Sequence, residues 1–225
     1  MEPKPYKIDN ELSIIVNEPP VQYGNPVMSF DSGTLQSRYT YADYLTWTDN
    51  VRRELLDGFA KLMAGPKYIH SVISGNIFAK IWSYTKKRRG KCKVIHAPID
   101  VRLPQNGEIA NDKIYTVVQP DICVVCDPSK IDENGIIGAP DLVVEVQSPS
   151  TEKYVISTKF DLYEKAGVKE YWVVYPKSEL TVFLLQDNGK FDTGTTYNII
   201  HTPDAKVPLH TIQGFEIALK ELFED

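Results

Sequence analysis

The segment Asp-Leu-Val-Val-Glu-Val-Gln at residues 141–147 decides how the chain is expected to fold. Strong β-formers surround a single glutamate, and the side chains of a strand alternate between two faces. Glu145 and Gln147 therefore lie on the same face, opposite the face that carries Val146. A carboxylate in the middle of so apolar a strand is costly to bury alone, which predicts a charged partner or a metal ion beside it.

A second carboxylate for such a site has to come from another strand. Asp141 stands four residues from Glu145, about 13 Å along an extended strand, which is too far for both to bind one cation at ~2.0–2.6 Å. Asp121, at the start of the run DICVV at 121–125, stands on the preceding β-rich segment and lies beside Glu145 if the two strands pair. Two carboxylates that hold a metal, with a lysine nearby, are suited to hydrolyse a phosphodiester.

The remaining sequence predicts several strands and two main helices. Asp57-Gly58 is a strong turn signal within a hairpin at 53–63. Apolar residues recur every three or four positions from Tyr68 to Trp82, which predicts an amphipathic helix. A second helix is expected at about 152–166, entered through 148–151 and closed by Gly167. The β-rich segments 94–103, 114–126 and 136–147 predict a meander, with further strands at 170–175, 180–186 and 197–201 and short helices at 40–47 and 217–223.

The composition is that of a compact globular protein. Of the 225 residues, 42% are hydrophobic and 24% are charged, which excludes a chain that is mainly disordered. The net charge of −5 excludes a protein that binds nucleic acid through a uniformly basic surface. Frequent proline and glycine near the start predict an irregular N-terminal arm at 1–38, followed by one domain at 39–225.

The sequence also predicts a cytoplasmic protein without a membrane segment. No apolar run approaches the ~20 residues that span a bilayer, and the first residues lack the layout of a signal peptide. Three cysteines favour a reducing compartment and argue against a disulfide framework. Cys123 and Cys126 point to opposite faces of a strand and have no second pair with which to bind zinc, so both are assigned to the core.

Several motifs occur together and in order, and they carry a family resemblance. They are Pro120-Asp121, the run EVQSPS at 145–150, Lys159, Tyr163 with AGV at 166–168, and EYWVV at 170–174, preceded by RELLDG at 53–58 and by His70. From about residue 41 to 186 the chain resembles the Uma-type putative restriction endonuclease family, which belongs to the PD-(D/E)xK nuclease superfamily. The resemblance implies an α/β (α+β) fold in which a restriction endonuclease-like central mixed sheet is flanked by helices.

The resemblance also implies roles for individual residues. Asp121 and Glu145 are the implied metal ligands. Lys159 is the implied catalytic lysine, and Glu54 is an accessory acid. The superfamily often has a lysine two residues after the acidic residue, where this chain has Gln147. The family pattern allows the lysine to come from the following helix, and Gln147 then keeps an orienting role.

Each candidate also has a purely structural interpretation. Asp121 can simply begin a strand after a proline, and Lys159 can be a solvated helix lysine. Glu54 can be an ordinary surface residue near a tight turn. His70, on the apolar side of its helix, is more often a buried histidine with a satisfied hydrogen bond than a base or a ligand. We keep His70 as a second-tier candidate.

A cluster of basic residues follows the first long helix. It comprises Lys86, Lys87, Arg88 and Arg89, with Lys91 and Lys93 close behind. Such a run is usually a solvated helix end, where cations also suit the helix dipole. It is nevertheless the best candidate in the sequence for contact with the phosphates of a nucleic acid.

These inferences together predict a magnesium-dependent nuclease that acts on DNA, with Mn²⁺ as a substitute for Mg²⁺. A homodimer is expected because cutting two strands requires two sites and the N-terminal arm can be exchanged between copies. The alternative is a binding module for nucleic acid or protein that keeps the fold but has a weakened site, because Gln147 replaces a lysine. Metal binding by the paired acids distinguishes the enzyme from the module.

Overall fold

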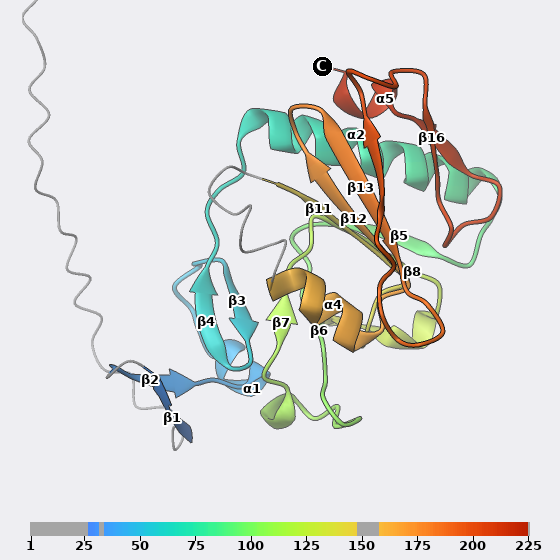
Figure 1. The fold of residues 1–225 in the computed structure, drawn as a ribbon. Coiled ribbons are helices and arrows are strands. Elements are labelled where there is room, and N and C mark those ends of the chain that lie inside the picture. Colours follow the sequence, from blue (N-terminus) through green and yellow to red (C-terminus); the bar gives the residue numbers. More distant parts are fainter. Residues whose placement is uncertain (1–26, 32–33, 148–157, 225) are drawn as a thin grey trace, which may run out of the picture.

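The structure, a computed structural model, describes residues 27–31, 34–147 and 158–224 and contains two mixed β-sheets with few helices (Figure 1). We call the sheet that contains residues 142–146 the central sheet and the other the second sheet. Each has six strands. The α+β architecture confirms the predicted fold class, with the strands divided between two mixed sheets.

The central sheet positions most of the candidate residues. Its strands are β5 (Lys93–His96), β8 (Ile122–Val125), β11 (Leu142–Val146), β12 (Glu170–Tyr175), β13 (Glu179–Leu184) and β14 (Thr195–Asn198). Their order across the sheet is β14-β13-β12-β11-β8-β5. Only β11 and β12 run parallel, and the other neighbours are antiparallel. The predicted pairing of 170–175 with 180–186 is confirmed.

The second sheet is built from shorter strands. They are β3 (Arg53–Leu56), β4 (Phe59–Leu62), β6 (Val101–Arg102), β7 (Val117–Val118), β9 (Ile131–Asp132) and β10 (Gly135–Ile137). Their order is β4-β3-β7-β6-β10-β9, and only β6 and β10 run parallel. The hairpin predicted around Asp57-Gly58 is confirmed as β3 and β4.

The chain crosses between the two sheets several times, so the predicted meander is wrong. The segments 94–103, 114–126 and 136–147 each contain a strand from both sheets. Pro98, Pro120 and Pro140 lie at the three crossings. Proline has no N–H to donate to a ladder, so it interrupts the hydrogen bonding of a strand inside a sheet. The prolines therefore end one strand and allow the next to join the other sheet.

Helices cover both faces of the central sheet, and one short helix packs on the second sheet. The helices are α1 (Tyr41–Tyr44), α2 (Tyr68–Lys87), α4 (Phe160–Ala166) and α5 (Lys220–Phe223), with single turns η1 (Asn111–Lys113) and η2 (Pro128–Lys130). Two hairpins complete the fold, β1 (Val27–Asp31) with β2 (Thr34–Arg38) and β15 (Lys206–Pro208) with β16 (Glu216–Ala218). No helix within the described ranges is long and apolar enough to cross a membrane.

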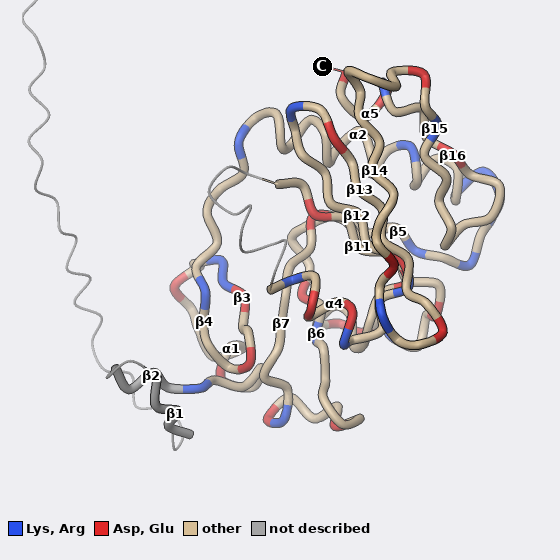
Figure 2. Tube along the Cα trace, in the orientation of Figure 1, with Lys and Arg blue, Asp and Glu red and all other residues tan. Residues whose placement is uncertain are grey.

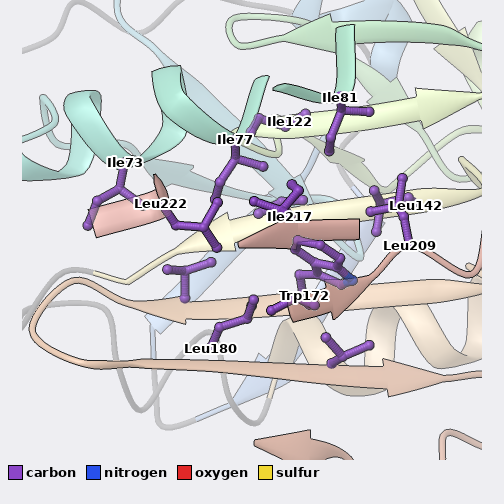
Figure 3. Close-up of a cluster of buried hydrophobic side chains, with 14 of the residues drawn as sticks. Ile73, Ile77, Ile81, Ile122, Leu142, Trp172, Leu180, Leu209, Ile217 and Leu222 are labelled. Carbon is purple, nitrogen blue, oxygen red and sulfur yellow. The ribbon is translucent and has the colours of Figure 1, made fainter. Parts of the chain in front are cut away.

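Two apolar clusters lie on opposite faces of the central sheet. The first packs the sheet against α2, α5 and the β15–β16 hairpin, with Ile77 and Trp172 near its middle (Figure 3). The second packs the sheet against α4 and the second sheet, and it includes Val143 and Tyr163. Val146 belongs to the first cluster, so the predicted alternation along 141–147 is confirmed. Glu145 and Gln147 therefore face α4 and the second sheet.

Some predicted elements differ in extent from those observed. The strand expected at 197–201 lies at 195–198, and the helix expected at 217–223 begins at Lys220 after β16. Gly167 ends α4 in the left-handed region with φ of 86°, as predicted for a C-cap. The first part of that helix, 152–157, and its entry at 148–151 lie outside the described residues. So do residues 1–26 of the predicted N-terminal arm, whose described end forms the β1–β2 hairpin.

The cysteine prediction is partly wrong. Cys92 and Cys126 form a disulfide. Lys93 lies opposite Val125 in the β5–β8 ladder, so these two cysteines occupy the next pair of facing positions. Their separation of 34 residues hides this pairing in the sequence. Cys123 is a free, buried cysteine, and it packs on the face opposite to Cys126, as expected.

Candidate active site

The carboxylates of Asp121 and Glu145 come from adjacent strands. β8 and β11 are antiparallel, and Ile122 lies opposite Val144. The next positions, Asp121 and Glu145, therefore lie side by side where the ladder ends. The N–H of Val146 donates a 2.8 Å hydrogen bond to Oδ2 of Asp121 and holds that carboxylate against β11. The predicted pairing of the two strands is confirmed.

Lys159 joins a carboxylate from each sheet. Its Nζ lies 2.8 Å from Oε1 of Glu54 on β3 and 2.7 Å from Oε1 of Glu145 on β11. These three side chains are only 3–7% exposed, so water screens their charges poorly. The N–H of Gln119 donates a 3.0 Å hydrogen bond to the same oxygen of Glu54. Lys159 directly precedes Phe160, the first residue of α4, which places the ammonium between the sheets.

Burial, and the excess of carboxylates over ammonium groups, determine which groups of this cluster are protonated. Burial, with the neighbouring Asp121 and Glu54 carboxylates, raises the pKa of Glu145 to about 7, although Lys159 acts in the opposite direction. Burial by itself lowers the pKa of Lys159, but the carboxylates of Glu145 and Glu54 outweigh burial and raise it. At neutral pH Lys159 is therefore an ammonium, whereas Glu145 takes up and releases a proton.

Tyr163 and Gln119 belong to the site, but sequence reasoning did not find them there. The hydroxyl of Tyr163 donates a 2.7 Å hydrogen bond to Oε1 of Glu145. Burial and the charge of Glu145 raise the pKa of Tyr163, so it remains a donor. The spacing of four residues from Lys159, which puts both on one helix face, is a signal that could have identified it. Gln119 acts on Glu54 through its backbone N–H, for which the sequence carries no signal.

His70 lies against Asp121 at the start of α2. Its Nε2 is 3.1 Å from Oδ2 of Asp121, and both side chains are half-buried. Burial lowers the pKa of His70, but the hydrogen bond to Asp121 and the charge of that carboxylate outweigh it and raise the pKa. The second-tier candidate thus joins the site as a partner of one of the two strand carboxylates.

Gln147 lies on the same face of the sheet as Glu145. It is 2% exposed, and its own N–H donates a 2.7 Å hydrogen bond to the carbonyl oxygen of Val174. Within the described part of the chain, neither the oxygen nor the nitrogen of its side-chain amide has a hydrogen-bond partner. A buried amide without partners is costly, so this position suits a group that hydrogen-bonds to a water or a ligand.

The carboxylate oxygens available at this site fit a magnesium ion held by two carboxylates. Among the described residues, the hydrogen bonds to Asp121 use Oδ2 and those to Glu145 use Oε1, which leaves Oδ1 and Oε2 for a cation. Mg²⁺ is usually bound by one or two carboxylates, with water completing its octahedron. No group of three or more His, Cys, Asp or Glu side chains within the described ranges is placed to hold a metal, so an all-protein cage is not supported.

The basic segment, residues 86–93, lies at the other end of α2 from the carboxylates. Its six cations are exposed, and Figure 2 shows Lys and Arg gathered where α2 ends and the chain leads into β5. Arg88 lies over the ring of Tyr84, with its guanidinium carbon 4.8 Å from the ring centroid. Lys86 follows His70 by 16 residues, which corresponds to about 24 Å along a helix. The structure therefore does not bring this predicted contact surface into the carboxylate site.

The chain resembles known proteins over most of its length. The sequence model of the family Uma2, described as "Putative restriction endonuclease", matches residues 41–220. The uncharacterised protein slr1290 from Synechocystis is 32% identical over 151 residues, which are 65% of this chain and 74% of that protein. A crystal structure described as a putative nuclease belonging to DUF820, from Anabaena variabilis, shares the fold. It is 22% identical, has a TM-score of 0.63, and the match covers 82% of this chain and 97% of that one. Because this family model matches most of the chain, including every candidate site residue, the chain belongs to the Uma2 family.

Proposed function

We propose that this protein is a Mg²⁺-dependent nuclease that hydrolyses phosphodiester bonds of DNA, with Mn²⁺ able to replace Mg²⁺. The observation that carries the proposal is the buried ammonium of Lys159, which bridges Glu54 and Glu145 beside the carboxylate of Asp121. The description of the family and the fold of the Anabaena variabilis protein support the same class of activity.

In the proposed site Asp121 and Glu145 hold the cation. When bound, Mg²⁺ supplies a Lewis acid for the phosphoryl group. The N–H of Val146 and the imidazole of His70 orient the Asp121 carboxylate. The hydroxyl of Tyr163 orients Glu145 through the oxygen that faces Lys159. Each ligand is thus fixed by neighbours before a cation arrives, which reduces the cost of ordering the site.

Lys159 acts through its charge rather than by proton transfer. Its raised pKa keeps it protonated at neutral pH, so it cannot serve as a base. An ammonium has three N–H donors, and two of them are directed to Glu54 and Glu145. The third is the donor for a non-bridging phosphate oxygen, where negative charge develops in the transition state. Glu54, held by Lys159 and by the N–H of Gln119, keeps the ammonium in position.

Gln147 contributes an orienting hydrogen bond in this proposal. Its amide is buried on the same face as Glu145, and it can donate to a phosphate oxygen or accept from a water. A neutral amide cannot offset charge as an ammonium does, so the loss of Gln147 should cost less than the loss of Lys159.

Single-turnover cleavage of plasmid DNA in Mg²⁺ or Mn²⁺ tests the proposal. Lys159→Ala should lower the cleavage rate by ~100-fold or more, whereas Lys165→Ala, an exposed lysine on the same helix, should leave it unchanged. Because Lys159→Ala leaves two buried carboxylates without their partner, we expect it to lower stability by about 3–5 kcal/mol. Rates should therefore be measured well below the unfolding temperature of the variant. Asp121→Asn, which removes a charge that is only 19% exposed, is the second inactive variant expected.

A charge-relocation experiment separates a catalytic role of Lys159 from a structural one. In the Lys159→Ala background, Gln147→Lys should restore part of the rate because it returns an ammonium to the strand that carries Glu145. Full activity in Lys159→Ala would remove this residue from the mechanism. A well-folded wild type that cleaves neither DNA strand with any divalent cation would instead favour the non-catalytic binding module.

A further inference from the structure

A second lysine, Lys61, lies on the same side of the second sheet as Glu54. The two residues are directly opposite in the β3–β4 ladder. Residues that face each other across an antiparallel pair project to the same face, with Cβ atoms about 4.5–5.5 Å apart. Since Glu54 binds Lys159 on that face, Lys61 lies beside the carboxylate cluster.

Lys61 also shares the electrostatic environment of the cluster. Burial lowers the pKa of Lys61 to about 8, and the charge of Lys159 acts in the same direction, while Glu54 opposes both. Glu54, which lies opposite Lys61 in the ladder, also binds Lys159, so the two lysines lie around the same carboxylate. Both remain cations at neutral pH, because a pKa of about 8 is above that value.

The two lysines differ in how they can meet a substrate. Lys159 is 4% exposed and is held by two carboxylates. Lys61 is half-buried and lies on β4, the edge strand of the second sheet, so it reaches the surface of the molecule. Figure 2 shows basic and acidic residues close together on the β3–β4 hairpin, which forms this edge. A phosphate that approaches the carboxylates from solvent can meet Lys61 before it meets Lys159.

We propose that Lys61 is a phosphate-contacting residue that holds the DNA backbone against the Glu54–Lys159–Glu145 cluster. The proposal rests on the proposed nuclease function and extends it, because it assigns substrate positioning to a residue of the hairpin. Lys159 then stabilises charge at the reacting phosphate, and Lys61 contacts the backbone at the rim of the site. A compact ammonium suits this task because it contacts phosphate as a point charge.

The affinity of the full chain for a 24-base-pair DNA duplex, measured against NaCl concentration, tests this contact. Fluorescence anisotropy in Ca²⁺ in place of Mg²⁺ reports binding with little hydrolysis. Each phosphate contact that is lost flattens the plot of log affinity against log salt by ~0.9. We therefore expect this change in Lys61→Ala and a slope close to that of the wild type in Lys61→Arg. Lys206→Ala removes an exposed lysine from the hairpin that packs on the opposite face of the central sheet, and it should keep the slope.

The outcomes separate this inference from the proposed function. A wild-type slope in Lys61→Ala overturns the contact, even if the variant is less stable, since a structural role does not change the number of phosphates bound. The slope tests Lys61 whether or not the wild type also cleaves plasmid DNA in Mg²⁺, so loss of cleavage alone affects only the proposed function. A wild type that does not bind the duplex at all overturns both proposals.

Discussion

In the proposed site, Glu145 must lose a proton before it can bind a cation. Burial and the nearby Asp121 and Glu54 carboxylates raise its pKa to about 7. Because only the ionised carboxylate binds metal, the fraction of competent protein falls as the pH decreases below 7. We expect the Mn²⁺ affinity of the wild type to fall ~10-fold for each pH unit in that range, as the linkage of one proton requires. Calorimetry from pH 5.5 to 8 measures this dependence.

The number of protons released provides the control for this prediction. Below pH 7 the binding enthalpy should change with the ionisation enthalpy of the buffer, because binding displaces the proton of Glu145. Above pH 8 that dependence should disappear. Affinity that does not change between pH 5.5 and 8 would mean that Glu145 is not a ligand, or that Lys159 keeps it fully ionised throughout.

At the level of the strands, two Pro-Asp pairs play similar structural parts. Asp121 directly precedes β8, and its carboxylate accepts a hydrogen bond from the N–H of Val146, the last residue of β11. Asp141 precedes β11 and accepts the N–H of Cys126 at the end of β8 through a 2.7 Å hydrogen bond. Each carboxylate thus closes one end of the same antiparallel pair. Only Asp121 lies beside Glu145, whereas Asp141 binds the exposed ammonium of Lys169.

Asp141→Asn should therefore lower stability without affecting metal binding. The change weakens a charge-assisted hydrogen bond in a buried position, which costs about 1–3 kcal/mol. Burial raises the pKa of Asp141, but Lys169 and the N–H of Cys126 outweigh it and lower the pKa. The stabilisation by Asp141 is then present above about pH 4 and is lost as the pH falls through the lowered pKa. Urea unfolding of wild type and variant at pH 7 and pH 3 measures the difference.

Metal titration of the same variant provides the comparison. Mn²⁺ affinity should be unchanged in Asp141→Asn and greatly reduced in Asp121→Asn. If both variants lose metal affinity to the same extent, the proposed division between a structural and a functional Pro-Asp pair is wrong.

The elements that sequence reasoning predicted well are those with local signals. The Asp57-Gly58 turn, the periodicity from Tyr68 to Trp82 and the alternation around Glu145 all depend on neighbours along the chain. The division into two sheets does not, because it depends on which distant strands pack together. The disulfide between Cys92 and Cys126 was missed for the same reason, since it follows from the register of β5 with β8.

The candidate site could be predicted in part. Asp121 and Glu145 were identified from residue type and strand pattern, and the family resemblance supplied Lys159 and Glu54. The bridge between sheets could not be foreseen, since Glu54 and Glu145 are separated by 91 positions in the sequence. Tyr163 and Gln119 contribute single hydrogen bonds whose targets only the tertiary structure defines.

On the scale of the whole molecule, the site depends on how the two sheets pack. Glu54 comes from the second sheet and Glu145 from the central sheet, and Lys159 connects them. The apolar cluster that contains Val143 and Tyr163 fills the space between the sheets around this ion pair. A buried ion pair is weak support for stability, so the packing of that cluster rather than the charges holds the sheets together.

The distance between the site and the basic segment leads to a prediction about substrate length. Lys86 is about 24 Å along α2 from His70, which corresponds to ~7 base pairs of B-form DNA at 3.4 Å each. If residues 86–93 contact the backbone of a duplex bound at the carboxylates, only a duplex that extends this far can reach them. Replacing the six cations by glutamine should therefore flatten the salt dependence of binding by ~0.9 per lost contact for a 24-base-pair duplex.

A 6-base-pair duplex provides the matched control, because it reaches only about 10 Å to either side of a central phosphate. Its affinity and salt slope should be the same for the wild type and for the variant in which the six cations are replaced. Lys61→Ala, in contrast, should change the salt slope equally for the long and the short duplex. The six cations are exposed and none takes part in the carboxylate cluster, so the variant should fold normally.

If the long duplex keeps the wild-type slope, the segment is a solvated helix end. If the short duplex loses affinity as well, the segment contributes through its long-range field rather than by direct contact, and that loss should appear only in low salt, where the Debye length grows well beyond its usual value of about 8–10 Å.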